Sequence, residues 1–157
     1  MGIRFLLILS CLFTSSVHAF TILELNNGWD FHEKGTLVHR SATVPGTIHT
    51  DLYNWAVIGD PFYSTNEAEF QWIETKTWEY SSVFICSKEL LKEKHIELQF
   101  DGLDTYADVF LNDSLRFTAE DMFLSYKIDI KNLVKGKNRL RVVFHPASEL
   151  IERKTSI

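Results

Sequence analysis

The sequence is poor in cysteine, proline, glycine and clustered positive charge, and each shortage excludes a class of protein. Its 157 residues include two Cys, three Pro and seven Gly, too few for a disulfide-stapled scaffold or a collagen-like repeat. The formal net charge is −5, and no stretch gathers Lys and Arg into a basic stripe. Because nucleic-acid binding needs such clusters to contact phosphates, we expect no nucleic-acid partner.

Long apolar runs are also scarce, and the exception lies at the N-terminus. Residues 1–19 contain a single cation, Arg4, followed by an apolar run over 5–13 and a small residue, Ala19, at the exit. This order is typical of a cleaved signal peptide, so we expect export to the periplasm, the cell exterior or the lysosome. A weak resemblance to a lipoprotein processing site at Cys11 is the alternative. The run is too short to span a bilayer, and we expect no membrane attachment after cleavage.

Once the signal is removed, few cysteines and histidines remain that could form a disulfide or a metal site. Cys86 is then alone, so neither an internal disulfide nor a thiolate metal site can form, and we expect a buried thiol. The remaining histidines are scattered, with no pair at i and i+4: His32, His39, His49, His95 and His145. No glycine-rich loop opens a helix. We therefore expect no metal site and no cofactor.

From residue 78 onward, the sequence does contain a period of two. The first such segment places five side chains on one face: Trp78, Tyr80, Ser82, Phe84 and Cys86. The same alternation recurs over 95–100, 124–130 and 140–144. Strands at this spacing, separated by polar turns, predict an all-β sandwich. We assign it to a single domain over residues 20–157.

The first half of this domain is less regular. Pro45-Gly46 predicts a turn, and Thr47 predicts the start of a short helix. Gly59-Asp60-Pro61 would end that helix. Residues 62–77 then follow neither the helical nor the strand period, and long loops in compact domains tend to carry function.

Carboxylates are numerous enough for a glycosidase pair, which needs two of them about 5 Å apart for retention. One of the two must also have its pKa raised by burial on a rigid element. Glu67 and Glu69 lie on the irregular loop, and Glu79 lies on the strand face opposite Trp78. We interpret these carboxylates as solvated charges and expect no catalytic residue in this chain, and the same interpretation covers Glu74, Asp101, Asp104 and Asp108.

The four tryptophans all lie between residues 29 and 78, where the strand pattern is weakest. Trp29 and Trp78 fall on strand patterns and Trp55 on a helical face, so we interpret these three as core packing. Trp72 is the candidate for stacking against a sugar ring, with the hydrogen-bonding side chains of Asn66 and Gln71 nearby.

Several stretches together resemble a known family: "GWDF", "VPGTIHTDLYNWAVIGDPFYSTNEAEFQWIETKTWEYSSVF", "LQFDGLDTYADVFLND" and "DMFLSYKIDIKNLVKGKNRLRVVFHPA". From about residue 25 to the end, the chain is similar to the N-terminal domain of β-mannosidases. These enzymes belong to the glycoside hydrolase group that includes β-galactosidase and β-glucuronidase. The Val-Pro-Gly turn occurs across that group, whereas "DPF", Asn66-Glu67 and Gln71-Trp72 resemble the mannosidase branch.

The resemblance implies a galactose-binding-like jelly-roll β-sandwich with one short helix. In this family, immunoglobulin-like domains and a TIM barrel follow, and the barrel carries both catalytic glutamates of a retaining mechanism. The helical pattern after Pro146 stops at Ile157 without a cap, so we expect a truncated chain without that barrel. The parent would be an exo-acting enzyme that removes terminal non-reducing β-D-mannose, and the chain alone would be inactive.

The resemblance also matches residues 62–72 to a loop that approaches the active site in related galactosidases. Asn66, Glu67 and Trp72 are therefore the candidate substrate-binding residues, with β-mannosides as the carbohydrate partner and the missing barrel as the packing partner. Two alternatives stay open: a free-standing carbohydrate-binding module, and a purely structural domain that buttresses a barrel of the β-galactosidase or β-glucuronidase type.

Overall fold

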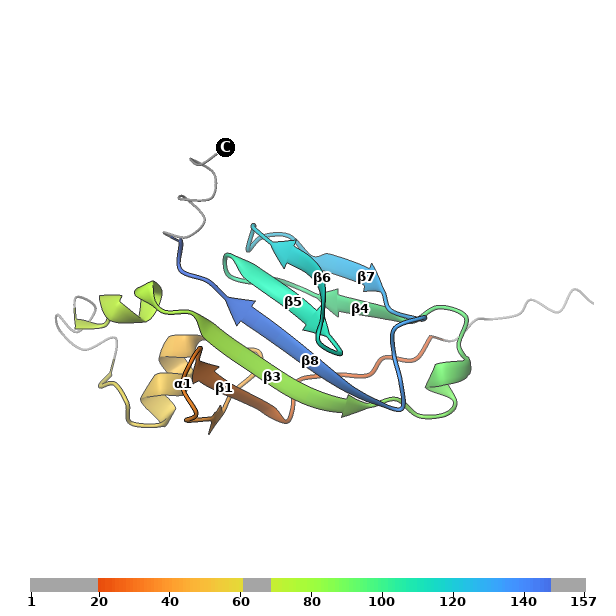
Figure 1. The fold of residues 1–157 in the computed structure, drawn as a ribbon, viewed down its shortest axis with the longest axis horizontal. Coiled ribbons are helices and arrows are strands. Elements are labelled where there is room, and N and C mark those ends of the chain that lie inside the picture. Colours follow the sequence, from red (N-terminus) through yellow and green to blue (C-terminus); the bar gives the residue numbers. More distant parts are fainter. Residues whose placement is uncertain (1–19, 61–68, 148–157) are drawn as a thin grey trace, which may run out of the picture.

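The computed structural model describes residues 20–60 and 69–147, which form two β-sheets and a flanking helix (Figure 1). The larger sheet has six strands in the order β2-β1-β3-β8-β5-β6, and the smaller sheet pairs β4 with β7. The strands are β1 Trp29–Glu33, β2 Arg40–Ser41, β3 Trp78–Ile85, β4 Glu97–Phe100, β5 Ala107–Leu111, β6 Ser114–Ala119, β7 Tyr126–Asp129 and β8 Lys137–Phe144. The helical elements are α1 Ile48–Asn54 and the 3₁₀ turns η1 Gln71–Thr75 and η2 Leu90–Lys92. The predicted all-β architecture with one short helix is confirmed, while the predicted signal peptide lies outside the described residues.

Strand alternation decides which side chains enter the core between the two sheets. The predicted inner face of β3 is buried along its whole length, from Trp78 to the thiol of Cys86. Leu98 of the smaller sheet packs in the same cluster. Because burying a large apolar side chain contributes about 1.5–3 kcal/mol, this cluster holds the two sheets together. One expectation is wrong: β7 begins at Tyr126, so Leu124 lies before the strand and is 53% exposed.

Helix α1 begins where the sequence predicts and ends earlier than expected. Thr47 is the N-cap, and its side chain accepts a hydrogen bond from the backbone N–H of Thr50. Leu52 faces the core with 1% of its surface exposed. The helix ends at Asn54, well before Gly59, because the chain turns into a left-handed conformation at Ala56, where φ is 51°.

The hairpin between β5 and β6 turns at two polar residues, Asn112 and Asp113. Asn112 and Asp113 have φ values of 51° and 65°, as a two-residue type I′ turn requires. The side-chain amide of Asn112 donates to the carbonyl of Leu133 at 3.1 Å and to Oδ1 of Asn138 at 3.0 Å. The turn is thereby tied to the segment that leads into β8.

Within residues 20–60 and 69–147, no helix is both long enough and apolar enough to cross a bilayer.

Candidate functional site

Trp72 is the one predicted substrate-binding residue that the structure describes, and it lies on the short turn η1. Beneath it Ile73 is buried, and the carbonyl of Ile73 accepts a 3.0 Å hydrogen bond from the indole N–H of Trp78. The rings of Trp72 and Trp78 contact each other with centroids 6.2 Å apart. Trp72 keeps 37% of its surface exposed, so it offers a partly held aromatic face of the kind that sugars stack on. Asn66 and Glu67 lie outside the described residues.

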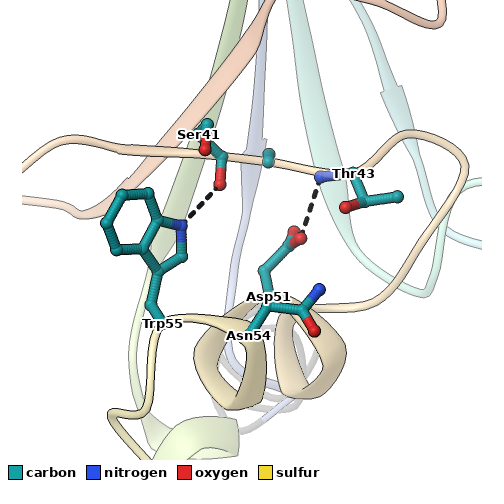
Figure 2. Close-up of a pocket in the computed structure, with 6 residues that line it drawn as sticks. Ser41, Thr43, Asp51, Asn54 and Trp55 are labelled. Carbon is teal, nitrogen blue, oxygen red and sulfur yellow. Dashed lines mark hydrogen bonds between the residues drawn. The ribbon is translucent and has the colours of Figure 1, made fainter.

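A second surface, which the sequence did not single out, is an open hollow of about 280 Å³ between α1 and the strand β2 with its following loop (Figure 2). Trp55 is 48% exposed here, so the expectation that it packs in the core is wrong. It lies just past the end of α1 and no longer follows the buried face of the helix. Its indole N–H donates to the carbonyl of Ser41 at 2.9 Å. The hollow is lined by Ser41, Ala42, Thr43, Asp51, Asn54 and Trp55.

Asp51 at the floor of this hollow has a structural role. Only 1% of the residue is exposed. Its Oδ1 accepts a 2.8 Å hydrogen bond from the backbone N–H of Thr43, and its Oδ2 accepts a 3.0 Å bond from the hydroxyl of Tyr80. Burial, and then the adjacent Asp51 carboxylate, raise the pKa of Tyr80, so the phenol stays protonated and donating. With both oxygens engaged, Asp51 is not free to act as an acid or nucleophile.

Glu79 is the second buried carboxylate of the described residues, and its burial corrects the prediction of a solvated charge. It lies on the outer face of β3 with 8% exposure. Arg141 on the adjacent strand β8 approaches it at 3.1 Å and Arg139 at 3.7 Å, while Arg141 also stacks over Phe110 at 4.1 Å. Long side chains from the neighbouring strand therefore cover Glu79, although it faces away from the core.

The remaining candidate carboxylates divide into exposed and partly buried ones. Four are exposed as predicted: Glu69, Glu74, Asp101 and Asp104. Asp108 is partly covered, accepting from Thr118 at 2.6 Å and contacting His145 at 2.9 Å. Glu67 lies outside the described residues. Within the described ranges, both buried carboxylates are thus engaged in structural bonds.

The histidines are less scattered than their sequence positions indicate. The rings of His32 and His39 lie 4.0 Å apart, and Asp30 is next to them. A search at helical i, i+4 spacing misses this pair because the two side chains meet across a hairpin. The pairing of Phe31 with Arg40 makes His32 and His39 neighbours, and only the strand register reveals that relationship.

Comparisons with known proteins agree with this architecture. A family model described as the glycosyl hydrolase 2 galactose-binding domain-like family matches residues 29–156. The chain is 32% identical over 152 residues to the β-mannosidase of Mus musculus, covering 97% of this chain and 17% of that protein. It is 34% identical over 132 residues to β-mannosidase B of Emericella nidulans, covering 80% of this chain and 16% of that one. The chain thus spans less than a fifth of the length of these relatives.

Solved structures of glycoside hydrolases share this fold. The crystal structure of the β-D-mannosidase from Dictyoglomus thermophilum superposes with a TM-score of 0.81 at 36% identity, covering 86% of this chain and 17% of that one. The β-D-glucuronidase of the same organism reaches a TM-score of 0.58 at 18% identity, covering 78% and 19%, which shows a shared fold. The resemblance read from the sequence motifs is confirmed. With the family model covering the two sheets, α1 and the Trp72 turn, the chain belongs to the galactose-binding domain-like family of glycosyl hydrolase 2.

Proposed function

We propose that this chain is the N-terminal, non-catalytic domain of an exo-acting, retaining β-mannosidase whose other domains hydrolyse terminal non-reducing β-D-mannose residues. The observation that carries this proposal is the difference between two solved relatives from one organism. The β-D-mannosidase matches at a TM-score of 0.81 and 36% identity, whereas the β-D-glucuronidase matches at 0.58 and 18%. A match this much stronger favours the mannosidase branch over its sister activities.

Exposed apolar side chains support a role in packing against the rest of such an enzyme. The loop before β7 presents Met122, Phe123 and Leu124, exposed to 41%, 86% and 53%. Around the end of α1, Tyr53 and Trp55 are each about half exposed. Exposed apolar side chains that gather in this way are typical of contacts between domains. The domain would buttress the barrel that performs the reaction.

The same domain would also form part of the rim of the sugar site. Trp72 has the exposed aromatic face that a sugar ring needs, and its position on η1 is fixed by contact with Trp78. By the family resemblance, Asn66 and Glu67 would provide hydrogen bonds to hydroxyl groups beside it. Residues 1–19 would direct the parent protein out of the cytoplasm, because their charge and apolar order suit a signal peptide.

The decisive experiment compares this chain with the longer protein that carries it. We expect the longer protein to release nitrophenol from a nitrophenyl β-mannoside, with little turnover of the β-glucuronide or β-galactoside. The chain alone should release none above background. Turnover of the β-mannoside by the chain alone, or a preference of the longer protein for the β-glucuronide, would contradict the proposal.

A free-standing carbohydrate-binding module is the second candidate, favoured by the exposed rings of Trp72 and Trp55. Titration calorimetry of the isolated chain with mannobiose separates the two. A module would bind with measurable heat, whereas a rim that needs the barrel to complete its pocket would bind weakly or not at all.

A further inference from the structure

Three metal-ligating side chains meet on the outer face of the larger sheet, at its β1–β2 edge. Asp30 and His32 are two residues apart on β1 and therefore share a face. His39 immediately precedes β2 and lies across from His32, as the pairing of Phe31 with Arg40 requires. Nδ1 of His39 is 3.2 Å from Oδ1 of Asp30. One ligand atom from each of the three residues lies within 4.8 Å of the others.

His32 supplies an independent reason to look for a ligand here. The residue is 9% exposed, and its Nδ1 is buried without a hydrogen-bond partner. An unpaired buried polar atom is destabilising, and native structures rarely leave one without a partner or ligand. An imidazole nitrogen of this kind is a ligand that zinc accepts.

The surroundings of the triad hold one of its ligands in place. The hydroxyl of Ser81 donates a 3.1 Å hydrogen bond to Oδ1 of Asp30, and supporting bonds of this kind orient carboxylate ligands. Glu79 lies across from His32 on β3, and its charge is offset by Arg139 and Arg141. The negative charge available to a cation at this edge is therefore that of Asp30.

We propose that Asp30, His32 and His39 bind one divalent cation of the zinc class. Two imidazoles and one carboxylate form a donor set that zinc accepts, with a fourth position left for water. The three ligand atoms lie within 4.8 Å of one another. Bonds of about 2.0–2.1 Å from each of them to one zinc ion require the ligand atoms to lie closer together than that. His39 can supply that movement, because 47% of its side chain is exposed.

Such an ion would stabilise the pairing of β1 with β2 at the edge of the larger sheet. Strand β2 has two residues and pairs with β1 at two positions, and its Ser41 carbonyl accepts a hydrogen bond from Trp55. A metal bound at His39 would add a further connection at the start of this short strand. A ligand that binds only the folded state stabilises it by an amount that grows with the logarithm of the ratio of free ligand concentration to Kd. The bound ion would therefore join β1 to the segment that leads to the hollow beside α1.

The test is titration of the chain, without a polyhistidine tag, with Zn²⁺ by calorimetry, and with Co²⁺ by visible absorption. We expect one ion per chain and a cobalt spectrum typical of tetrahedral nitrogen and oxygen ligands. The melting temperature should rise by about 5–10 °C at a free Zn²⁺ concentration about 100 times Kd. A chelator should reverse the rise.

Substitutions of the proposed ligands test where the ion binds. His39→Asn and Asp30→Asn should each weaken Zn²⁺ binding by at least about tenfold, while His95→Asn, at an exposed histidine before β4, should leave it unchanged. Because His39 and Asp30 are not buried, both variants should fold even if His32→Asn does not. Absence of saturable Zn²⁺ binding, or equal affinity in His39→Asn and His95→Asn, would overturn the proposal.

Discussion

The hydroxyl of Tyr80 on β3 donates a 3.0 Å hydrogen bond to Oδ2 of Asp51 on α1. Since Oδ1 of Asp51 also accepts from the backbone N–H of Thr43 at 2.8 Å, one carboxylate joins the central strand, the helix and the loop before it. Asp51 is 1% exposed, so water cannot replace either partner. The position of α1, and with it the hollow beside Trp55, depends on this carboxylate.

Replacing Asp51 should therefore destabilise the domain. Asp51→Ala leaves two buried donors without an acceptor, and hydrogen bonds to charged groups contribute about 1.5–3 kcal/mol each. We expect the free energy of unfolding, measured with urea, to fall by about 2–4 kcal/mol. Asn54→Ala on the same helix is the control, with an expected loss below about 1 kcal/mol. Equal losses in both variants would show that the carboxylate has no special role.

Tyr80 gives the domain a defined response to alkaline pH. Burial, and then the Asp51 carboxylate, raise the pKa of Tyr80 above its ordinary value of about 10. The folded state therefore keeps a proton that the unfolded state releases, so this stabilisation is complete below about pH 10 and is lost as the pH rises toward the folded pKa. The unfolding free energy should decline more steeply above pH 10 in the native chain than in Tyr80→Phe. Parallel declines would contradict this.

Gly46 is required by close backbone contact. A Cβ at this position would lie 2.3 Å from the carbonyl oxygen of Thr43, which cannot move without displacing the loop held by Asp51. We expect Gly46→Ala to lower the unfolding free energy by about 2–3 kcal/mol. Gly136→Ala is the matched control, because nothing lies within 4 Å of its added methyl group. That control should stay within about 0.5 kcal/mol of the native chain.

The ion pair of Glu79 should matter more than its place on the outer face indicates. Removing Glu79 leaves Arg141, which is 3.1 Å away and largely covered, without its charge partner. We expect Glu79→Ala to cost about 2–3 kcal/mol in unfolding free energy. Glu97→Ala removes the exposed pair with Lys127, at 3.5 Å, and should cost less than about 1 kcal/mol. A difference between the two variants within experimental error would mean that burial does not strengthen the Glu79 pair.

Substitution of Trp72 in the longer enzyme distinguishes a domain that contacts the substrate from one that only supports the catalytic barrel. If its ring contacts the sugar, Trp72→Ala should lower kcat/KM for a β-mannoside by about tenfold, equivalent to ~1.4 kcal/mol. Trp55→Ala removes a similar ring, exposed to 48%, from the surface that we assign to packing against the rest of the enzyme. It should leave kcat/KM unchanged. If Trp72→Ala lowers the melting temperature and leaves kcat/KM at the native value, the domain has a supporting role and Trp72 does not contact the substrate.

The sequence predicts β3, β4, β7 and β8 because a period of two reports directly which side chains face the core, and it does not predict β6. It also predicts the start of α1, since the Thr47 cap is a local signal. It misses the burial of Glu79, because alternation assigns a face and does not reveal that Arg139 and Arg141 cover it. The roles of Asp51 and of the His32–His39 pair depend on partners distant in sequence or on strand register, which no local pattern encodes.

The tethered turn of the β5–β6 hairpin has a consequence for glycosylation. Asn112-Asp113-Ser114 is an acceptor sequence for an N-linked glycan. In the folded hairpin the amide nitrogen that would carry the glycan donates to both Leu133 and Asn138. A glycan would replace one of those two protons, so attachment and closure of the hairpin compete for the same atom. In a cell that glycosylates exported proteins, the timing of folding would therefore decide whether Asn112 is modified.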